Sequence, residues 1–383
     1  MRWPDDERSG FDRPRLAIIV AANRRRGAEV QGERIAEGLH ARGWDVDLIA
    51  LGIADPGTPT IAAEVLTSRT SAQLGRLDVE TVRALRSRFR HSDYDLVLAN
   101  GSITLRYVAA ASPWLLPRSA RGYVSIGEPQ YWIRNGAQLL RQRALMRRVG
   151  WVLAVSTVTA RQVRRIAGSD VDVTVVHGGV TPDFLEVAPS TRSASLNVLF
   201  VGSLSDEKDP ASTLAAVGVA LAAGADVNLR FVGAGPLADD LSSRAARDGL
   251  SSRVAFTGAK TSVVSEYAWA DVLLVTSRTE GLPGVVLEAG AAGVPTLAFD
   301  VGGVGDVVRD EVTGRLVPAG DIQGLAGAIA AVAADEEERL RLANNIRALV
   351  AAEFLIDSAV DRYDSALRRH LRVDRLRDSD QVT

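Results

Sequence analysis

Short apolar runs alternate with longer stretches of helical periodicity in the first half of the chain. The runs that predict strands are RLAIIVA, DVDLIAL, DLVLANG, GYVSIG, WVLAVS and VTVVHGG, and 28–42 has the spacing of an amphipathic helix. Strands separated by helices in this way predict βαβ units and a parallel sheet. We therefore expect the first half to form one doubly wound α/β domain.

The same alternation restarts at Leu196, after LEVAPSTRSAS, a Pro/Ser/Thr stretch without periodicity. It continues through LNVLFVGS, VNLRFVGAG, RVAFTG, DVLLVTS, PTLAFDVGG and GRLVPAG, with helices over 211–223 and 236–248. We predict two Rossmann-like domains joined by a linker, and a helical segment that packs back on the first domain. In chain order these parts are 1–185, 186–196, 197–350 and 351–383. The two sheets would face each other across a cleft, because ligands bind outside the carboxyl ends of such strands.

Length and composition are consistent with two α/β domains and argue against several classes of function. The 383 residues exceed the size at which one core stops growing, and 46% hydrophobic with 24% charged residues is a globular balance. A formal net charge of -2 gives no basic field for nucleic acid. The chain has no cysteine and four scattered histidines, which argues against a metal site. The N-terminus lacks a signal-peptide core and no apolar run reaches the roughly 18 residues of a membrane span, so we expect a cytoplasmic protein.

Glu288 lies within an apolar run, VVLEAGAA, where a solvated charge is unexpected. Pro283 suits the start of a helix and Gly293 suits its end, so we predict a helix over about 283–292 that is apolar nearly all round. An unpaired carboxylate in such a helix is costly. Glu288 is therefore either a structural ion pair or a solvent-facing edge, or it accepts hydrogen bonds from paired ligand hydroxyls, as acidic residues do on ribose.

A second glutamate, Glu280, lies in the loop before this helix, from which its carboxylate can reach the other end of the same ligand. The helix N-terminus that follows provides a place for phosphate charge. Lys208, one of very few lysines, lies in an earlier strand-to-helix loop and is either a phosphate contact or a solvated surface lysine. We predict that the residues that lead from Glu280 into the helix also bind this ligand: Gly281, Leu282, Pro283 and Gly284.

These residues stand in motifs that resemble a known family. EGLPGVVLEAGAAGVP resembles the Glu-x7-Glu signature of the retaining glycosyltransferases of family 4, and the following DVGGVGDVVRDEVTGRLVPAGD is similar to that family's sequence. VLFVGSLSDEKDP resembles the family's start of the second domain. VTVVHGGVTPDF resembles its linker region, with His177-Gly178 in place of Pro-Asn. The resemblance is dense over 197–321 and loose in the first domain.

The resemblance implies the GT-B fold, with the donor on the second domain and the acceptor on the first. It implies transfer of a sugar from a nucleotide diphosphate sugar with retention of anomeric configuration, without a metal or other cofactor. Glu288 would hold the ribose hydroxyls and Glu280 would lie beside the donor sugar. Electrostatic stabilisation of the leaving diphosphate and positioning of the acceptor would carry the catalysis.

One phosphate contact of the family is missing from its usual place. We expect the loop that opens with Gly202 and Ser203 to bind the donor; it has Lys208 at the family's lysine position but Ser203 at the arginine position. The resemblance therefore leaves the second cation to Arg278, or to Arg24, Arg25 or Arg26 across the cleft.

Gly233-x-Gly235-x-x-Ala238 follows a strand and precedes a helix, which matches a dinucleotide fingerprint. An NAD site also requires an acidic residue at the end of the next strand, and RVAFTGAK has none. We interpret Gly233 and Gly235 as a tight turn near the donor nucleotide.

The first domain offers two further candidates. Gly27, with Arg26 before it, follows the first strand, and the resemblance implies that this loop approaches the donor phosphates and the acceptor; the alternative is a solvated basic turn. Glu128 follows a strand in SIGEPQYW, where many members of the family carry a histidine. It would position an acceptor hydroxyl or act as a base, with Tyr131 and Trp132 as a sugar-stacking surface, or it is a surface acid beside packed aromatic rings.

The acceptor is a glycan, a lipid-linked molecule or a small molecule. LLRQRALMRRVGWVL carries an arginine cluster over 141–148 that would suit peripheral contact with the inner face of a membrane; a solvated basic face is the alternative. Two other functions stay open at this point. One is a non-hydrolysing nucleotide-sugar epimerase, and the other is a catalytically silent module that binds a nucleotide sugar or a glycan.

Overall fold

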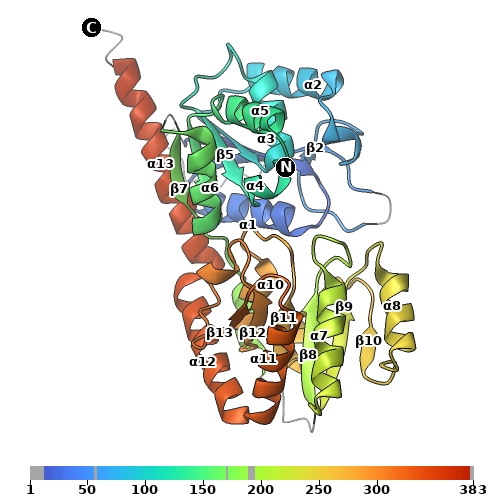
Figure 1. The fold of residues 1–383 in the computed structure, drawn as a ribbon. Helices are drawn as coiled ribbons and strands as arrows, with labels where there is room; N and C mark the ends of the chain where they lie inside the picture. The colour runs from blue at the N-terminus through green and yellow to red at the C-terminus, as the bar shows by residue number, and fades with distance from the viewer. Residues whose placement is uncertain (1–12, 56–57, 170, 189–194, 380–383) are drawn as a thin grey trace. The chain divides into compact units, whose positions relative to one another are not determined.

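The computed structural model describes residues 13–55, 58–169, 171–188 and 195–379. It divides the chain into two compact units, each with its own sheet and core (Figure 1). Unit 1 runs up to Gly178 and takes in the residues from Ile356 onward, and unit 2 is Gly179–Leu355.

Within the described residues, unit 1 contains a seven-stranded sheet in which all neighbouring strands are parallel. One of its inner strands, β1, is buried on both faces, which is why the sequence there is a continuous apolar run. In spatial order the strands are β3 (Glu64–Val65), β2 (Asp45–Gly52), β1 (Arg15–Ala22), β4 (Leu96–Asn100), β5 (Arg121–Ser125), β6 (Trp151–Ala154) and β7 (Asp172–Val175).

Helices cover both faces of this sheet. α1 (Gly27–Ala41) and α13 (Ile356–Ser379) pack on one face of the sheet, and the other helices of the unit pack on the opposite face. Those on the second side are η1 (Gln73–Gly75), α2 (Val79–Arg90), α3 (Ser102–Ala111), α5 (Gly136–Met146) and α6 (Thr157–Ala167), with the short α4 (Pro129–Trp132) against α6.

The chain returns to unit 1 through α13, which runs beside β7 (Figure 1). Val360 and Leu367 are fully buried in its core. Trp44 Nε1 donates to Asp364 Oδ1 at 2.6 Å, and the ring of His370 stacks on Trp151 with centroids 4.5 Å apart.

Unit 2 contains a six-stranded parallel sheet within the described residues. In spatial order its strands are β10 (Val254–Phe256), β9 (Val227–Val232), β8 (Leu196–Val201), β11 (Val272–Val275), β12 (Thr296–Phe299) and β13 (Gly314–Val317).

Two apolar clusters lie on the two faces of the second sheet. One cluster buries α7 (Pro210–Ala222), α8 (Ala238–Arg247) and α11 (Ile322–Ala334). The other buries η2 (Pro182–Glu186), α9 (Val264–Trp269), α10 (Gly284–Ala291), η3 (Val304–Asp306) and the second half of α12 (Glu336–Glu353).

The two parallel sheets confirm the predicted α/β class with two Rossmann-like domains. The limits differ from those set by composition, because Val180 pairs with Leu355 and Phe184 is buried in the second core, so unit 2 begins before the predicted linker. Residues 189–194 of that linker, like 1–12 of the N-terminus, lie outside the described residues. Pro283 is the residue before α10 rather than its first residue.

Candidate functional site

The predicted donor-site residues of unit 2 come from loops that follow three neighbouring strands. β9, β8 and β11 are adjacent and parallel, so the loops after them leave the same edge of the sheet. Gly233 and Gly235 follow β9, Lys208 follows β8, and Glu280 follows β11. The carboxyl edge of a doubly wound sheet is where such folds bind ligands.

Lys208 and Glu280 form an ion pair at this edge. Lys208 Nζ lies 2.6 Å from Glu280 Oε1, and Ser277 Oγ donates to the same oxygen at 2.6 Å. The Glu280 side chain is 8% exposed and that of Lys208 is 30% exposed. A nearly buried carboxylate is thus held by two donors, one of which still reaches solvent.

The loop after β8 is built to hold Lys208 in this position. Asp209 has a left-handed backbone conformation with φ of 44° and caps α7 through a hydrogen bond from Ser212 N. Thr276, at the end of β11, donates to the carbonyl oxygen of Asp209 at 2.8 Å. The lysine loop is therefore tied to the strand that leads to Glu280.

Glu288 lies on α10, one turn into the helix, and is half-buried. Tyr267, on α9, is fully buried and donates from its hydroxyl to Glu288 Oε2 at 2.9 Å. Burial, and then the neighbouring Glu288 carboxylate, raise the pKa of Tyr267 well above its usual value, so the phenol keeps its proton. The carboxylate is oriented by a neutral donor.

Gly233 and Gly235 have a structural reason to be glycine. A Cβ atom on Gly233, whose φ is 150°, would lie 1.8 Å from the carbonyl oxygen of Gly202, and one on Gly235 would lie 2.3 Å from that of Leu204. The turns after β8 and β9 thus pack backbone to backbone. Their contact with a ligand stays a prediction.

Arg278 is the candidate in unit 2 for the second cation that would contact the diphosphate. Ser203 is half-buried in the loop after β8 and provides no charge. Arg278 Nε lies 3.3 Å from Asp209 Oδ2, next in sequence to Lys208, and its side chain is 56% exposed. Its backbone N–H donates to Glu207 O at 2.9 Å, which fixes the two loops to each other.

Gly281, Leu282, Pro283 and Gly284 lead directly into α10, as the sequence predicts. Pro283 is buried, whereas Gly284 is exposed and a Cβ atom there would meet nothing within 4 Å. There is thus open space beside the first residue of α10, and helix N-termini favour negative charge.

The candidates of unit 1 lie at the carboxyl edge of the first sheet, after β1 and β5. Arg26 and Gly27 are exposed at the start of α1, while Arg24 pairs at 3.3 Å with the buried Glu29. Burial raises the pKa of Glu29 although Arg24 opposes this effect. Glu128 Oε2 accepts a hydrogen bond from Gln162 Nε2 at 2.7 Å.

Sequence reasoning missed Tyr267, Ser277 and Thr276. Each contacts a predicted residue through the tertiary structure: Tyr267 contacts Glu288, Ser277 contacts Glu280, and Thr276 donates to the carbonyl oxygen of Lys208. No spacing rule pairs a tyrosine with a glutamate of another helix. The only local signal was Ser277, three positions before Glu280 in the same loop.

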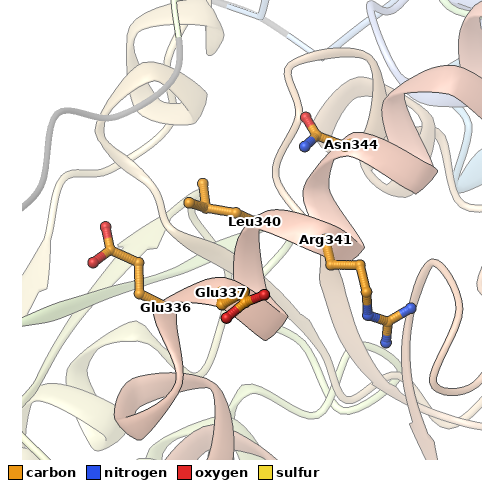
Figure 2. A pocket seen from close by; sticks show the side chains of 5 residues that line it. All are labelled: Glu336, Glu337, Leu340, Arg341 and Asn344. Atoms are coloured by element: carbon orange, nitrogen blue, oxygen red, sulfur yellow. The ribbon is translucent and has the colours of Figure 1, made fainter.

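A surface hollow on α12 is lined by Glu336, Glu337, Leu340, Arg341 and Asn344 (Figure 2). All five side chains come from one helix, and none is a predicted site residue.

Across the described residues, no three histidine, aspartate or glutamate side chains gather as a metal ion would need. Every helix in that part of the chain is too short or too polar to cross a bilayer.

Both halves of the chain match known protein families. Residues 25–184 match Glycosyltransferase Family 4, and residues 189–349 match Glycosyl transferases group 1.

Curated relatives have related names. The chain is 34% identical over 221 residues to a D-inositol 3-phosphate glycosyltransferase of Mycolicibacterium vanbaalenii, covering 52% of this chain and 49% of the relative. It is 31% identical over 167 residues to an alpha-D-kanosaminyltransferase of Streptomyces kanamyceticus, covering 43% of each. The chain thus spans about half the length of these curated relatives.

Solved structures share the fold along nearly the whole chain. Sucrose-phosphate synthase of Thermosynechococcus elongatus has a TM-score of 0.79 at 21% identity, covering 94% of this chain and 100% of that one. Anabaena HepE in complex with UDP and glucose has a TM-score of 0.77 at 21% identity, covering 93% and 100%. These likenesses confirm the predicted GT-B fold.

Proposed function

Since the chain belongs to glycosyltransferase family 4, we propose that it transfers a sugar from a nucleotide diphosphate sugar to an acceptor hydroxyl with retention of anomeric configuration. The observation that carries this proposal is the Lys208 and Glu280 pair, which lies at the carboxyl edge of the second sheet in the loops that precede α7 and α10. A cation and a carboxylate side by side suit the junction of diphosphate and sugar in the donor.

We assign the roles by position. Glu288 accepts hydrogen bonds from the ribose hydroxyls while Tyr267 holds one of its oxygens. Lys208, with Arg278 nearby, faces the diphosphate, and the start of α10 adds partial positive charge. Glu280 lies beside the donor sugar. These groups stabilise the charge that develops on the leaving diphosphate.

The reaction forms a bond between the acceptor oxygen and the anomeric carbon as the bond from that carbon to the diphosphate breaks. The acceptor proton leaves with the diphosphate, and Glu128 of unit 1 is the candidate that positions the acceptor hydroxyl. The sequence and the fold leave the acceptor as a class: a glycan, a lipid-linked molecule or a small molecule. No metal or other cofactor is included in this proposal.

The first test is thermal stabilisation by UDP, GDP, ADP and TDP and their common sugars. UDP leads the panel because HepE was solved with it. Ligand at about 100 times its Kd stabilises the folded state by roughly 2.7 kcal/mol. We expect one nucleotide to stabilise the parent and Glu288→Ala to lose that effect. The exposed Glu337→Ala, on α12, removes an acid elsewhere and should keep it.

The second test separates transfer from the two rival functions. Consumption of the donor that depends on an acceptor, with an α-linked product from an α-linked donor, supports retaining transfer. A change of sugar stereochemistry without an acceptor indicates the epimerase. A folded protein that binds the donor and consumes none of it is the silent module, and a protein that no donor stabilises contradicts the whole proposal.

A further inference from the structure

The charge of the chain is concentrated in one segment of unit 1. Between Asp95 and Asp170 there are eleven arginines, no lysine and a single acidic residue, Glu128, although the formal net charge of the whole chain is -2. Some of these arginines are close enough to act on each other, since burial and then the charge of Arg141 lower the pKa of Arg106, and burial and then the charges of Arg148 and Arg118 lower the pKa of Arg121. Such local excess creates a field that net charge hides.

α5 presents two different faces. Gln138, Gln142, Leu145 and Met146 are its less exposed positions and recur at helical spacing, so they form the side that packs on the unit. Leu140, Arg143 and Arg147 recur three and four positions apart on the opposite side, and all three are exposed. The outer face of α5 is therefore both apolar and cationic.

Large apolar side chains are exposed in the same place. Among the residues that the structure describes, nine large hydrophobic side chains are exposed, and four of them lie on α4 and α5. On α4 Trp132 is 54% exposed, and on α5 Leu140 is 70% exposed. Exposed apolar groups that cluster beside arginines mark an interaction surface rather than scattered surface residues. We call Tyr131, Trp132, Leu139, Leu140, Arg143 and Arg147 the α4–α5 patch.

We propose that the α4–α5 patch docks the protein on the surface of an anionic phospholipid bilayer. The arginines lie at the level of the lipid phosphates, and Leu140 enters the layer between headgroups and acyl chains. Tryptophan and tyrosine favour this layer because each ring has an apolar body and a polar atom. A nucleic acid would use the arginines and aromatic rings but not two exposed leucines, so the observations favour lipid.

The proposal rests on none of the donor-site residues, and its test is independent of sugar transfer. The full chain is mixed with extruded phosphatidylcholine vesicles, with or without phosphatidylglycerol, and the vesicles are floated through a density gradient. We expect binding to the anionic vesicles, weakening as salt is raised, and little binding to phosphatidylcholine alone.

Two variants divide the patch by chemistry. Arg143→Glu with Arg147→Glu should weaken binding at least about tenfold. Leu139→Ser with Leu140→Ser keeps the arginines but removes the apolar side chains, and this variant should no longer float with the vesicles. Arg244→Glu with Arg247→Glu changes the net charge equally in the last turn of α8, in unit 2, and should leave binding unchanged. Far-UV circular dichroism checks folding, and Arg143→Gln with Arg147→Gln replaces the charge reversal if that variant does not fold.

Each other outcome overturns the proposal. The first is that the protein does not bind anionic vesicles at low salt. The second is that the α8 control loses as much vesicle binding as the arginine variant, and the third is that the leucine variant binds vesicles as well as the parent does. Binding of a single-stranded oligonucleotide that depends on Arg143 and Arg147, without vesicle binding, would assign the patch to nucleic acid instead.

Discussion

Tyr267 and Glu288 are 21 positions apart, on different helices, and their contact is made by burial. The phenol is packed against Phe184 with ring centroids 5.7 Å apart, so its hydroxyl has little freedom. The hydrogen bond from this phenol therefore fixes the orientation of the Glu288 carboxylate through a neutral donor.

Tyr267→Phe should therefore weaken binding of the donor nucleotide about five- to tenfold, the effect of one hydrogen bond. Isothermal titration with the nucleotide diphosphate measures it. Tyr94→Phe is the matched control, because Tyr94 also donates from a buried position to a carboxylate, Asp47, but in unit 1. A 2′,3′-dideoxy nucleotide, which lacks both ribose hydroxyls, should bind the parent and Tyr267→Phe alike. An undiminished loss with that ligand would contradict the role of Glu288 on ribose.

Gly233 shows how backbone packing limits the site. Gly233→Ala should lower the free energy of unfolding by about 3 kcal/mol or more, because the new methyl group collides with the Gly202 carbonyl oxygen as well as straining φ. Gly224 also has a positive φ, 93°, but a Cβ atom there meets nothing within 4 Å. Gly224→Ala should cost about 1 kcal/mol. Urea unfolding measures the free energy of unfolding of both variants. Equal losses would mean that backbone movement relieves the collision at Gly233.

At the scale of residues, the sequence placed the candidate site residues in loops after strands but did not predict how their side chains pair. Glu280 and Lys208 could be placed after strands by the hydrophobic pattern. Their ion pair depends on β8 and β11 being neighbours, which is a property of strand order rather than of either loop. Tyr267 could not be found because its partner is on another helix.

At the scale of elements, buried strands and helices with a strong apolar pattern were predictable. α1, α7, α8 and α10 lie within a few residues of their expected limits. α2 was not among the predicted helices, although Val82, Leu85 and Phe89 recur on one face of it at helical spacing. β3 has two residues and owes its existence to pairing with β2.

The attachment of α13 to unit 1 should depend on pH. Burial lowers the pKa of His370 to about 4, and Arg369 adds to this effect while Asp172 opposes it. The unfolded chain, with a histidine pKa of about 6.5, therefore takes up the proton first as pH falls. Stability is lost between about pH 6.5 and 4, by up to about 2 kcal/mol from pH 7 to 5.

Chemical unfolding at pH 7 and pH 5 tests this expectation. His370→Phe keeps a ring on Trp151 but cannot titrate, so its stability should fall less between the two pH values. His91→Gln changes an exposed histidine of the same unit and should behave as the parent. An equal fall in the parent and His370→Phe would show that other groups carry the pH dependence.

At the scale of the molecule, two separate cores predict two unfolding events. Leu367 of α13 is fully buried in the core of unit 1, so Leu367→Ala should destabilise that unit by about 2–5 kcal/mol. The nucleotide should raise the melting temperature of unit 2. Differential scanning calorimetry should show the substitution and the ligand acting on different transitions. A single transition moved by both would mean that the units unfold together.

The division of unit 1 between the two ends of the chain has a consequence for synthesis. The 177 residues of unit 2, Gly179–Leu355, leave the ribosome before the helix that completes the first core. At roughly 5–20 residues per second this is a delay on the order of ten to forty seconds. During that interval the surface that receives Val360 and Leu367 is uncovered, while the second unit can already be complete. The first half to be translated is thus the last to finish folding, and a nascent chain that stalls before its end would leave that apolar face open to chaperones.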